Sequence, residues 1–212
     1  MALKKEDGRK GADPKSALER IVAGARSHFF AHGFRGVTME DLAGELGMSK
    51  KTLYANFSSK TALLEAVIHD KFREVETDLD QITSGKSSDF PAALHSLLEC
   101  VQRHTGEIQP PFIRDIRREA PEIFKLVETL RRERIQRHFG KLLNQGRHAG
   151  LIRKDVPVNL IIEILLGAVQ GIMNPLKMEE LGLTPKTGFL SIIKVVLEGA
   201  IAQKGGKPYV SK

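Results

Sequence analysis

Two hydroxyl groups and two ammonium groups stand next to one another at Ser49, Lys50, Lys51 and Thr52. These groups donate hydrogen bonds to base edges and phosphate oxygens, so the chemistry that they offer is nucleic-acid recognition. The major groove of DNA admits one helix, and only the side chains on its leading turn reach the bases. Recognition of this kind therefore requires that the four residues open a short helix held by its neighbours.

The surrounding residues predict two short helices separated by a tight turn. Thr38 offers an N-cap oxygen and Asp41 a carboxylate near the helix start, so the first helix is expected to begin at Met39. Gly47 follows at the position where a left-handed residue ends a helix at little cost. Ser49 then caps the second helix. The sequence thus predicts a helix-turn-helix that presents the polar tetrad on its second helix.

The same stretch resembles the N-terminal domain of the tetracycline-repressor (TetR) family of bacterial transcriptional regulators over residues 15–68. The motifs that carry the resemblance are Gly33-Phe34, Thr38-Met39-Glu40-Asp41-Leu42-Ala43, Leu46-Gly47-Met48-Ser49, Thr52-Leu53-Tyr54, Asn56-Phe57 and Lys60. The resemblance implies base-edge contacts by Ser49, Lys50, Lys51 and Thr52, and phosphate contacts by Thr38, Tyr54, Asn56 and Lys60. Asn56 replaces the histidine common at its position in the family, so a plain helix-capping role stays open for it.

Helical spacing of apolar residues continues through the rest of the chain, so the expected fold class is all-α, with about nine helices and no strand pair. Besides the two short helices, the expected helices span residues 14–32, 59–82, 89–104, 112–119, 121–148, 158–174 and 185–203. Four parts follow from this layout: a flexible basic arm (1–13), a helix-turn-helix DNA-binding domain (14–58), a ligand-binding and dimerisation domain (59–204) and a flexible tail (205–212).

The helix over residues 158–174 is apolar around most of its circumference, which indicates packing on more than one side. Gly167 and Gly171 lie one turn apart and leave a bare patch where another helix can approach closely. We expect this helix and the helix over 186–203 to form a four-helix homodimer interface, as is usual in the family that the chain resembles. The alternative is packing within a monomer. A dimer would place two reading helices on a near-palindromic site in double-stranded DNA.

The resemblance also implies a small-molecule effector, bound in the space that the helices between Phe72 and Met173 enclose. The candidate ligand-binding residues are Leu94, Leu98, Phe112, Ile116, Phe139, Glu163, Val169, Gln170 and Met173. The apolar candidates are also compatible with ordinary core packing. The predicted function is a repressor that a largely apolar ligand releases from DNA. A corepressor-dependent or activating regulator, or a binding module that no longer reads DNA, are the alternatives.

Charge and cysteine content narrow the class of protein further. The net charge of +7 suits a polyanionic partner. A second run of basic residues, within 103–154, is interpreted as a solvated helical face, with an acidic effector or a second DNA contact as alternatives. Cys100, the one cysteine, excludes an intramolecular disulfide and is interpreted as a small buried side chain rather than an oxidant sensor. No signal peptide or spanning segment is found, so a cytoplasmic protein without a membrane partner is expected.

Enzymatic motifs are absent from the sequence. His28 and His32 lie one helical turn apart, but no third zinc ligand stands near them at a suitable spacing. There is no phosphate-binding loop, cysteine pair or Gly-x-Ser-x-Gly elbow. The sequence therefore predicts a protein that is not an enzyme and that holds no cofactor or metal.

Overall fold

The computed structural model describes residues 14–84 and 89–201, and this part of the chain folds into helices without a β-strand. Within these ranges the one strand-like pairing is an isolated antiparallel bridge between Ile152 and Ile201. The all-α fold class is therefore confirmed. The expectations for the arm (1–13) and the tail (205–212) lie outside the described residues.

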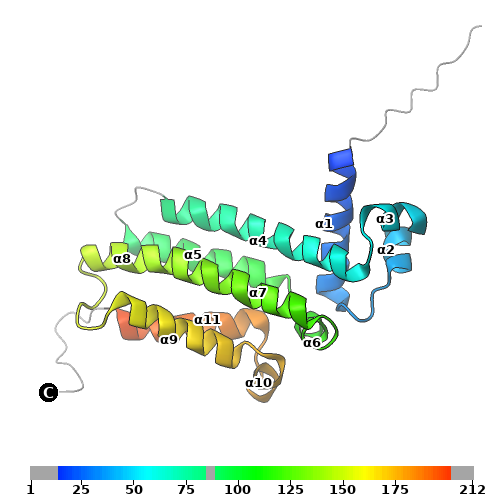
Figure 1. The fold of residues 1–212 in the computed structure, drawn as a ribbon. Helices are drawn as coiled ribbons and strands as arrows, with labels where there is room; N and C mark the ends of the chain where they lie inside the picture. Colours follow the sequence, from blue (N-terminus) through cyan, green and yellow to red (C-terminus); the bar gives the residue numbers. More distant parts are fainter. Residues whose placement is uncertain (1–13, 85–88, 202–212) are drawn as a thin grey trace, which may run out of the picture.

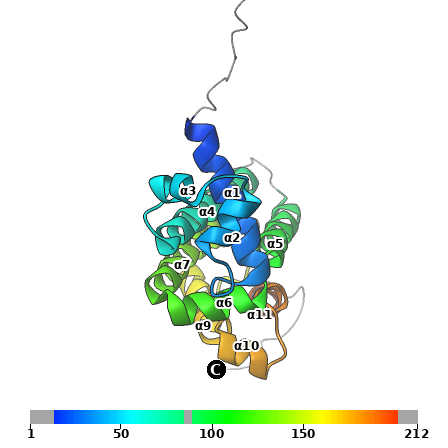
Figure 2. The ribbon, with the colours of Figure 1, turned by 90° about the vertical axis from the view of Figure 1, so that its right-hand side faces the viewer.

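Figure 1 shows the order and arrangement of the helices. They are α1 (Pro14–His32), α2 (Met39–Glu45), α3 (Lys50–Asn56), α4 (Lys60–Ser84), α5 (Phe90–Gly106), α6 (Pro110–Glu119), α7 (Pro121–Arg134), the π-helix η1 (Ile135–Phe139), α8 (Gly140–His148), α9 (Val158–Ile172), α10 (Pro175–Glu180) and α11 (Pro185–Ala200). Helices α1 to α3 form one end of the molecule, and α4 runs from them along the remaining helices. In Figure 2, α9, α10 and α11 lie on the side opposite to α3 and α4.

The predicted caps of the two short helices are present. Thr38 Oγ1 accepts a hydrogen bond from the Asp41 amide at 3.1 Å, and the Asp41 carboxylate accepts one from the Thr38 amide at 2.9 Å. Ser49 Oγ accepts a hydrogen bond from the Thr52 amide at 3.0 Å, which starts α3. Gly47 has a φ of +62°, the left-handed conformation that ends α2. The helix-turn-helix predicted from these residues is confirmed.

Proline accounts for two differences from the expected helices. Asn174 Oδ1 accepts a hydrogen bond from the Lys177 amide at 3.0 Å, and Pro175 occupies the first turn of α10. Proline fits the first turn of a helix because the amide that it lacks would have no partner there. Pro175 therefore both ends α9 and starts a further helix, which the sequence reading missed. For the same reason α6 begins at Pro110 rather than at Phe112.

The predicted helix over 121–148 is continuous but not uniform. Its middle is the π-helix η1, so α7 and α8 are separated by five residues with wider helical turns. Helical periodicity in the sequence does not distinguish a π segment from an α-helix, because one extra residue shifts the apolar face by only part of a turn. Three residues of η1, Ile135, His138 and Phe139, are buried.

Buried apolar residues form two clusters. The cluster at the DNA-binding end comprises residues of α1 to α4 together with Phe112, Ile116, Ala120 and Ile123 from α6 and the junction with α7. The second cluster joins α5, η1, α8, α9, α10 and α11, with Leu79 contributed by α4. Helix α6 thus completes the core of the helix-turn-helix end, although it lies far from it in the sequence. None of the described helices is long and apolar enough to cross a lipid bilayer.

Candidate DNA-reading surface and effector cavity

The first turn of α3 presents the polar tetrad to solvent. Leu53 is fully buried and anchors α3 against its neighbours, while Ser49, Lys50, Lys51 and Thr52 are all exposed. Ser49 Oγ and Thr52 Oγ1 lie 2.8 Å apart and hydrogen bond to each other. The structure therefore brings the four predicted base-contact residues together on one exposed turn, as a helix entering the major groove requires.

The two lysines of the tetrad differ in their surroundings. Lys50 Nζ lies 3.2 Å from Glu40 Oε2, in an exposed ion pair with α2. Lys51 has no hydrogen bond or ion pair with any residue that the structure describes. The Lys50 ammonium is thus held in a weak surface ion pair, whereas the Lys51 ammonium is not.

The residues predicted to contact phosphates lie around the same surface. Tyr54 is exposed, whereas Thr38 Oγ1 is engaged with Asp41, whose pKa is lowered mainly by the hydrogen bonds from Thr38. Asn56 Nδ2 donates to the Thr52 carbonyl at 2.8 Å, four residues back in the same helix. The Lys60 ammonium lies 4.3 Å from the centre of the Phe34 ring, and burial lowers its pKa.

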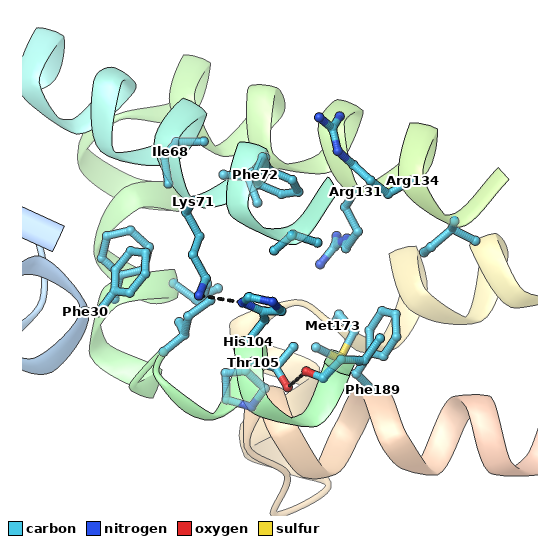
Figure 3. Close-up of a pocket in the computed structure, with 18 of the residues that line it drawn as sticks. Phe30, Ile68, Lys71, Phe72, His104, Thr105, Arg131, Arg134, Met173 and Phe189 are labelled. Carbon is cyan, nitrogen blue, oxygen red and sulfur yellow. Dashed lines mark hydrogen bonds between the residues drawn. The ribbon is translucent and has the colours of Figure 1, made fainter. Parts of the chain in front are cut away.

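A cavity of about 160 Å³ lies between the two apolar clusters (Figure 3). Its apolar walls come from α1, α4, α5, α6, α7, η1, α10 and α11. They include Phe30, Ile68, Phe72, Val75, Val101, Phe112, Ile113, Phe124, Ile135, Phe139, Met173, Met178 and Phe189. Ligand sites are lined mostly by apolar and aromatic side chains with a few polar groups, as this cavity is.

Phe112, Phe139 and Met173 are the predicted ligand-binding residues that line this cavity. The others lie elsewhere: Ile116 is in the core of the DNA-binding end, and Leu94, Leu98 and Val169 pack into the second cluster. Glu163 and Gln170 are exposed on α9, and Glu163 pairs with Arg132 at 3.3 Å. These two polar residues of α9 therefore face outward rather than into the cavity.

Four basic side chains that line the cavity were missed: Lys71, His104, Arg131 and Arg134. The signal for Lys71 is in the sequence, because it continues the apolar stripe of α4 formed by Val67, Ile68 and Val75. A lysine on a buried stripe indicates an internal charge with a dedicated partner. That partner is distant in sequence, so the pair becomes visible only in the folded chain.

Lys71 and His104 join α4 to α5 through a chain of polar contacts. Lys71 Nζ lies 2.8 Å from His104 Nδ1 and 2.8 Å from Glu107 Oε1, and His104 Nε2 lies 2.8 Å from Asp78 Oδ2. A lysine ammonium can only donate, so Nδ1 of His104 accepts and its Nε2–H donates to Asp78. This hydrogen bond is the main reason that the pKa of Asp78 is lowered.

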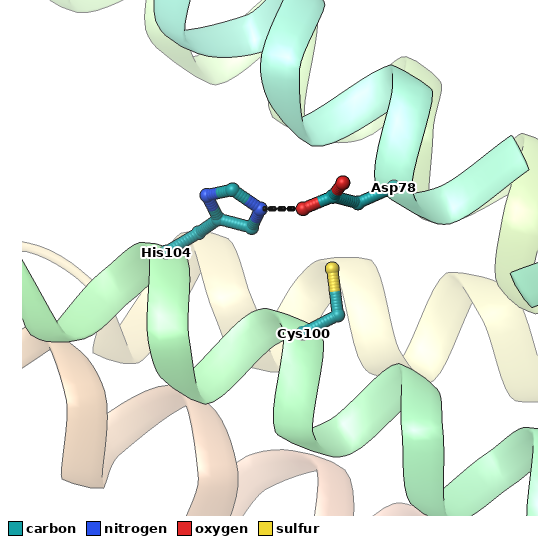
Figure 4. A group of neighbouring side chains, drawn as sticks. All are labelled: Asp78, Cys100 and His104. Carbon is teal, nitrogen blue, oxygen red and sulfur yellow. Dashed lines mark hydrogen bonds and ion pairs between the residues drawn. The ribbon is translucent and has the colours of Figure 1, made fainter. Parts of the chain in front are cut away.

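Asp78, Cys100 and His104 place three metal-ligating atoms within 4.8 Å of one another (Figure 4). Both ring nitrogens of His104 are already used by Lys71 and Asp78, so neither offers a free lone pair toward Cys100. Burial raises the pKa of the Cys100 thiol, which disfavours the thiolate that a metal would need. The residues therefore fit a hydrogen-bonded network better than a metal centre, and Cys100 is buried as expected.

An apolar surface covers the outer face of α9. Leu160 and Ile164 are 50% and 52% exposed, and a side chain at Gly167 or Gly171 would meet nothing within 4 Å. Helix α11 packs beside α9 and exposes Val195, at 71%. Two other apolar residues of α11, Ile193 and Leu197, are buried within the protomer.

Comparison with known proteins relates the helix-turn-helix end of the chain to a known protein family. The family described as "Bacterial regulatory proteins, tetR family" matches residues 21–67. The helix-turn-helix-type transcriptional regulator SrpR of Pseudomonas putida is 24% identical over 186 residues, which cover 88% of this chain and 84% of SrpR.

Solved structures share the fold over nearly the whole chain. A TetR transcription regulator from Haloarcula marismortui superposes with a TM-score of 0.69 at 18% identity, covering 89% of this chain and all of that one. SmeT, the repressor of the Stenotrophomonas maltophilia multidrug efflux pump SmeDEF, gives 0.60 at 16% identity, covering 91% and 94%. SmeT is also known as a complex with triclosan.

The fold combines an exposed helix-turn-helix with a helical bundle that holds an apolar cavity, and a long helix joins the two. This combination defines a DNA-binding transcriptional regulator that responds to a ligand. Residues 21–67 of the chain are similar to the TetR family of these regulators.

Proposed function

We propose that the protein is a homodimeric repressor, which reads a near-palindromic operator with α3 and leaves it when a small, largely apolar ligand fills the cavity. In this proposal residues 14–58 form the DNA-binding domain and residues 59–204 the ligand-binding and dimerisation domain. The observation that carries it is that Phe30, Ile68 and Phe112 belong both to the cavity wall and to the buried core of the helix-turn-helix end. A ligand in the cavity would touch the residues that hold the reading helix in place.

Helix α6 provides the mechanical link. The Phe30 and Phe112 rings pack edge to face, with their centres 4.8 Å apart. The Gln109 amide donates a hydrogen bond to the Phe30 carbonyl at 3.1 Å. Asp115 accepts a hydrogen bond from the Arg35 amide at 2.9 Å. A shift of α6 would therefore be transmitted to the C-terminal end of α1 and to the turn that leads into α2. A ligand that prefers the shifted state lowers operator affinity by the coupling free energy, typically about 1 to 3 kcal/mol.

The exposed stripe on α9 supports the dimer. Leu160, Ile164 and the two bare glycines would be covered if α9 and α11 packed against their counterparts in a second copy, across a two-fold axis. Two reading helices would then be held at a fixed separation, which is what a palindromic operator requires. The direction of regulation, repression released by a ligand, is consistent with SmeT, a repressor that is also known with triclosan bound.

The direct test is a nuclease footprint of the purified protein on the DNA upstream of its own gene, at a salt concentration near 150 mM where non-specific phosphate binding is weak. We expect protection of a near-palindromic sequence. Absence of protection, in a protein that still binds any DNA at low salt, would favour a corepressor-dependent regulator or a module that has lost its reading function. Binding restored by an added small molecule would identify the corepressor case.

The two lysine environments give a prediction for base reading. Lys51→Ala should weaken operator binding by about 1 to 3 kcal/mol and relax the preference at one base pair, because the free Lys51 ammonium reads a base edge. Lys50→Ala should act in the same way but more weakly, because Lys50 first loses its pair with Glu40. The measurement is fluorescence anisotropy with a set of operators that carry single base-pair changes.

Lys60→Ala is the matched control for a phosphate contact. It should weaken binding to all these operators alike and reduce the slope of log affinity against log salt by about one. Identical base preferences and identical salt slopes in the three variants would contradict this division of roles.

A further inference from the structure

Three of the four basic residues that line the cavity are already paired. Lys71 is bound by Glu107, and His104 by Asp78 and Lys71. Arg134 Nε lies 3.0 Å from Glu76 Oε2, and the Arg134 guanidinium also stacks 5.3 Å from the centre of the Phe72 ring. These three side chains hold helices together and have little capacity left for a ligand.

Arg131 is different, because it has no hydrogen bond or ion pair with any residue that the structure describes. Its side chain extends from α7 toward the interior, between Phe72 and Met173 (Figure 3). Burial lowers the pKa of its guanidinium, and the only opposing influence is the charge of Glu128, a neighbour on the same helix. A partly buried positive charge without a counter-ion is stabilised when an anion joins it.

We infer that the effector is an amphipathic anion, whose apolar body fills the cavity and whose carboxylate or similar head group pairs with Arg131. This inference deepens the proposed function and rests on it. A guanidinium presents two parallel N–H groups that match the two oxygens of a carboxylate. The apolar wall of the cavity includes Phe72, Ile135 and Met173, which suit a hydrocarbon chain or ring.

The position of Arg131 at the edge of the cavity supports a head group rather than a buried internal charge. The same side chain borders a shallow depression between α7 and α9, together with Leu166 and Gln170. Arg131 is accordingly only half-buried. An anionic head group at this place keeps contact with water while its apolar part lies inside.

The probes that test the inference are straight-chain carboxylates, from hexanoate to dodecanoate, and the primary alcohols of the same chain lengths. Binding to the full-length protein is measured by isothermal titration calorimetry without DNA. We expect the best carboxylate to bind at least about tenfold more tightly than its alcohol, since a charge-assisted hydrogen bond is stronger than a neutral one. Equal affinities, preference for the alcohol, or binding of neither series would overturn the inference.

Arg131→Met and Arg137→Met form the matched pair of variants. Arg137 is exposed on η1, pairs with Glu76 and Asp80, and lines neither the cavity nor the depression between α7 and α9, so its replacement removes the same charge away from the proposed head-group site. The preference for carboxylate over alcohol should be lost in Arg131→Met and kept in Arg137→Met. Loss of the preference in both variants, or in neither, would mean that Arg131 does not bind the anion.

Thermal unfolding of the unliganded protein adds a readout that separates ligand binding from a structural role. Arg131→Met should raise the melting temperature by about 2 to 4 °C or more, because it removes an unpaired charge from a partly buried site. A structural arginine would give a lower melting temperature instead. None of these measurements uses DNA, so the two proposals can fail separately. A failed footprint would count against the proposed repressor. Equal binding of carboxylate and alcohol would count against an anionic effector.

Discussion

Replacing Gly167 by leucine should abolish dimer formation while leaving the protomer folded. A Cβ at this position meets nothing within 4 Å in the protomer, so the larger side chain adds no strain there. In the proposed dimer the same position faces a second copy of α9 or α11, where a leucine would hold the helices apart. Operator affinity should then fall by about a hundredfold to ten-thousandfold, because the two half-sites are no longer bound by one linked molecule.

Gly167→Ala is the graded control for this variant. Alanine improves helix propensity by up to about 1 kcal/mol and adds only a methyl group, so the protomer should gain stability and the dimer should weaken little. Sedimentation velocity gives the oligomeric state, and anisotropy gives the operator affinity. A Gly167→Leu protein that remains dimeric and binds the operator normally would show that the stripe on α9 is not the interface.

The helix-turn-helix could be derived from the sequence because its determinants are local. Thr38, Ser49 and Gly47 act on backbone groups within three residues of themselves, so their effect on α2 and α3 is visible in the order of residues. The exposed turn of α3 follows from the same local spacing. Contacts to bases and phosphates do not follow from local spacing, because they depend on the nucleotides that each exposed side chain meets.

The effector cavity could be derived only in part because its walls are assembled from distant segments. Phe112, Phe139 and Met173 follow from the apolar faces of their helices, but Ile116, on the same helix as Phe112, is buried in the core of the DNA-binding end without lining the cavity. One position along a helix rotates a side chain by about 100°, so a small error in helix orientation moves a residue out of the cavity. The role of α11, which contributes Phe189, was missed for this reason.

The charged residues that line the cavity were not predicted from the sequence. Arg131 stands in a run of basic residues that was interpreted as a solvated face, and Arg132 and Arg137 in this run are indeed exposed. Arg131 differs from them because α7 turns it toward the cavity. A charged residue of this kind can be told from its neighbours only once the packing of the helix is known.

Phe112→Ala should both destabilise the protein and uncouple the cavity from the reading helix. Phe112 is fully buried, lines the cavity and holds α6 against Phe30 of α1. Its loss should lower the free energy of unfolding by about 3 to 5 kcal/mol. It should also reduce the effect of ligand on operator affinity, because the contact that transmits the shift of α6 is removed.

Phe139→Ala separates these two effects. Phe139 also lines the cavity and is buried, but it belongs to the second cluster and lies on η1, away from α1. Thermal unfolding should show that both variants lose a similar amount of stability. Coupling is measured as the ratio of the operator dissociation constants with and without the best-binding carboxylate. Only Phe112→Ala should bring this ratio close to one. If Phe139→Ala reduced this ratio as much as Phe112→Ala did, coupling would depend on filling the cavity as a whole, and α6 would have no special role. A reduced ratio in Phe112→Ala alone would instead place the transmission at the Phe30–Phe112 contact, because that contact distinguishes the two cavity-lining phenylalanines.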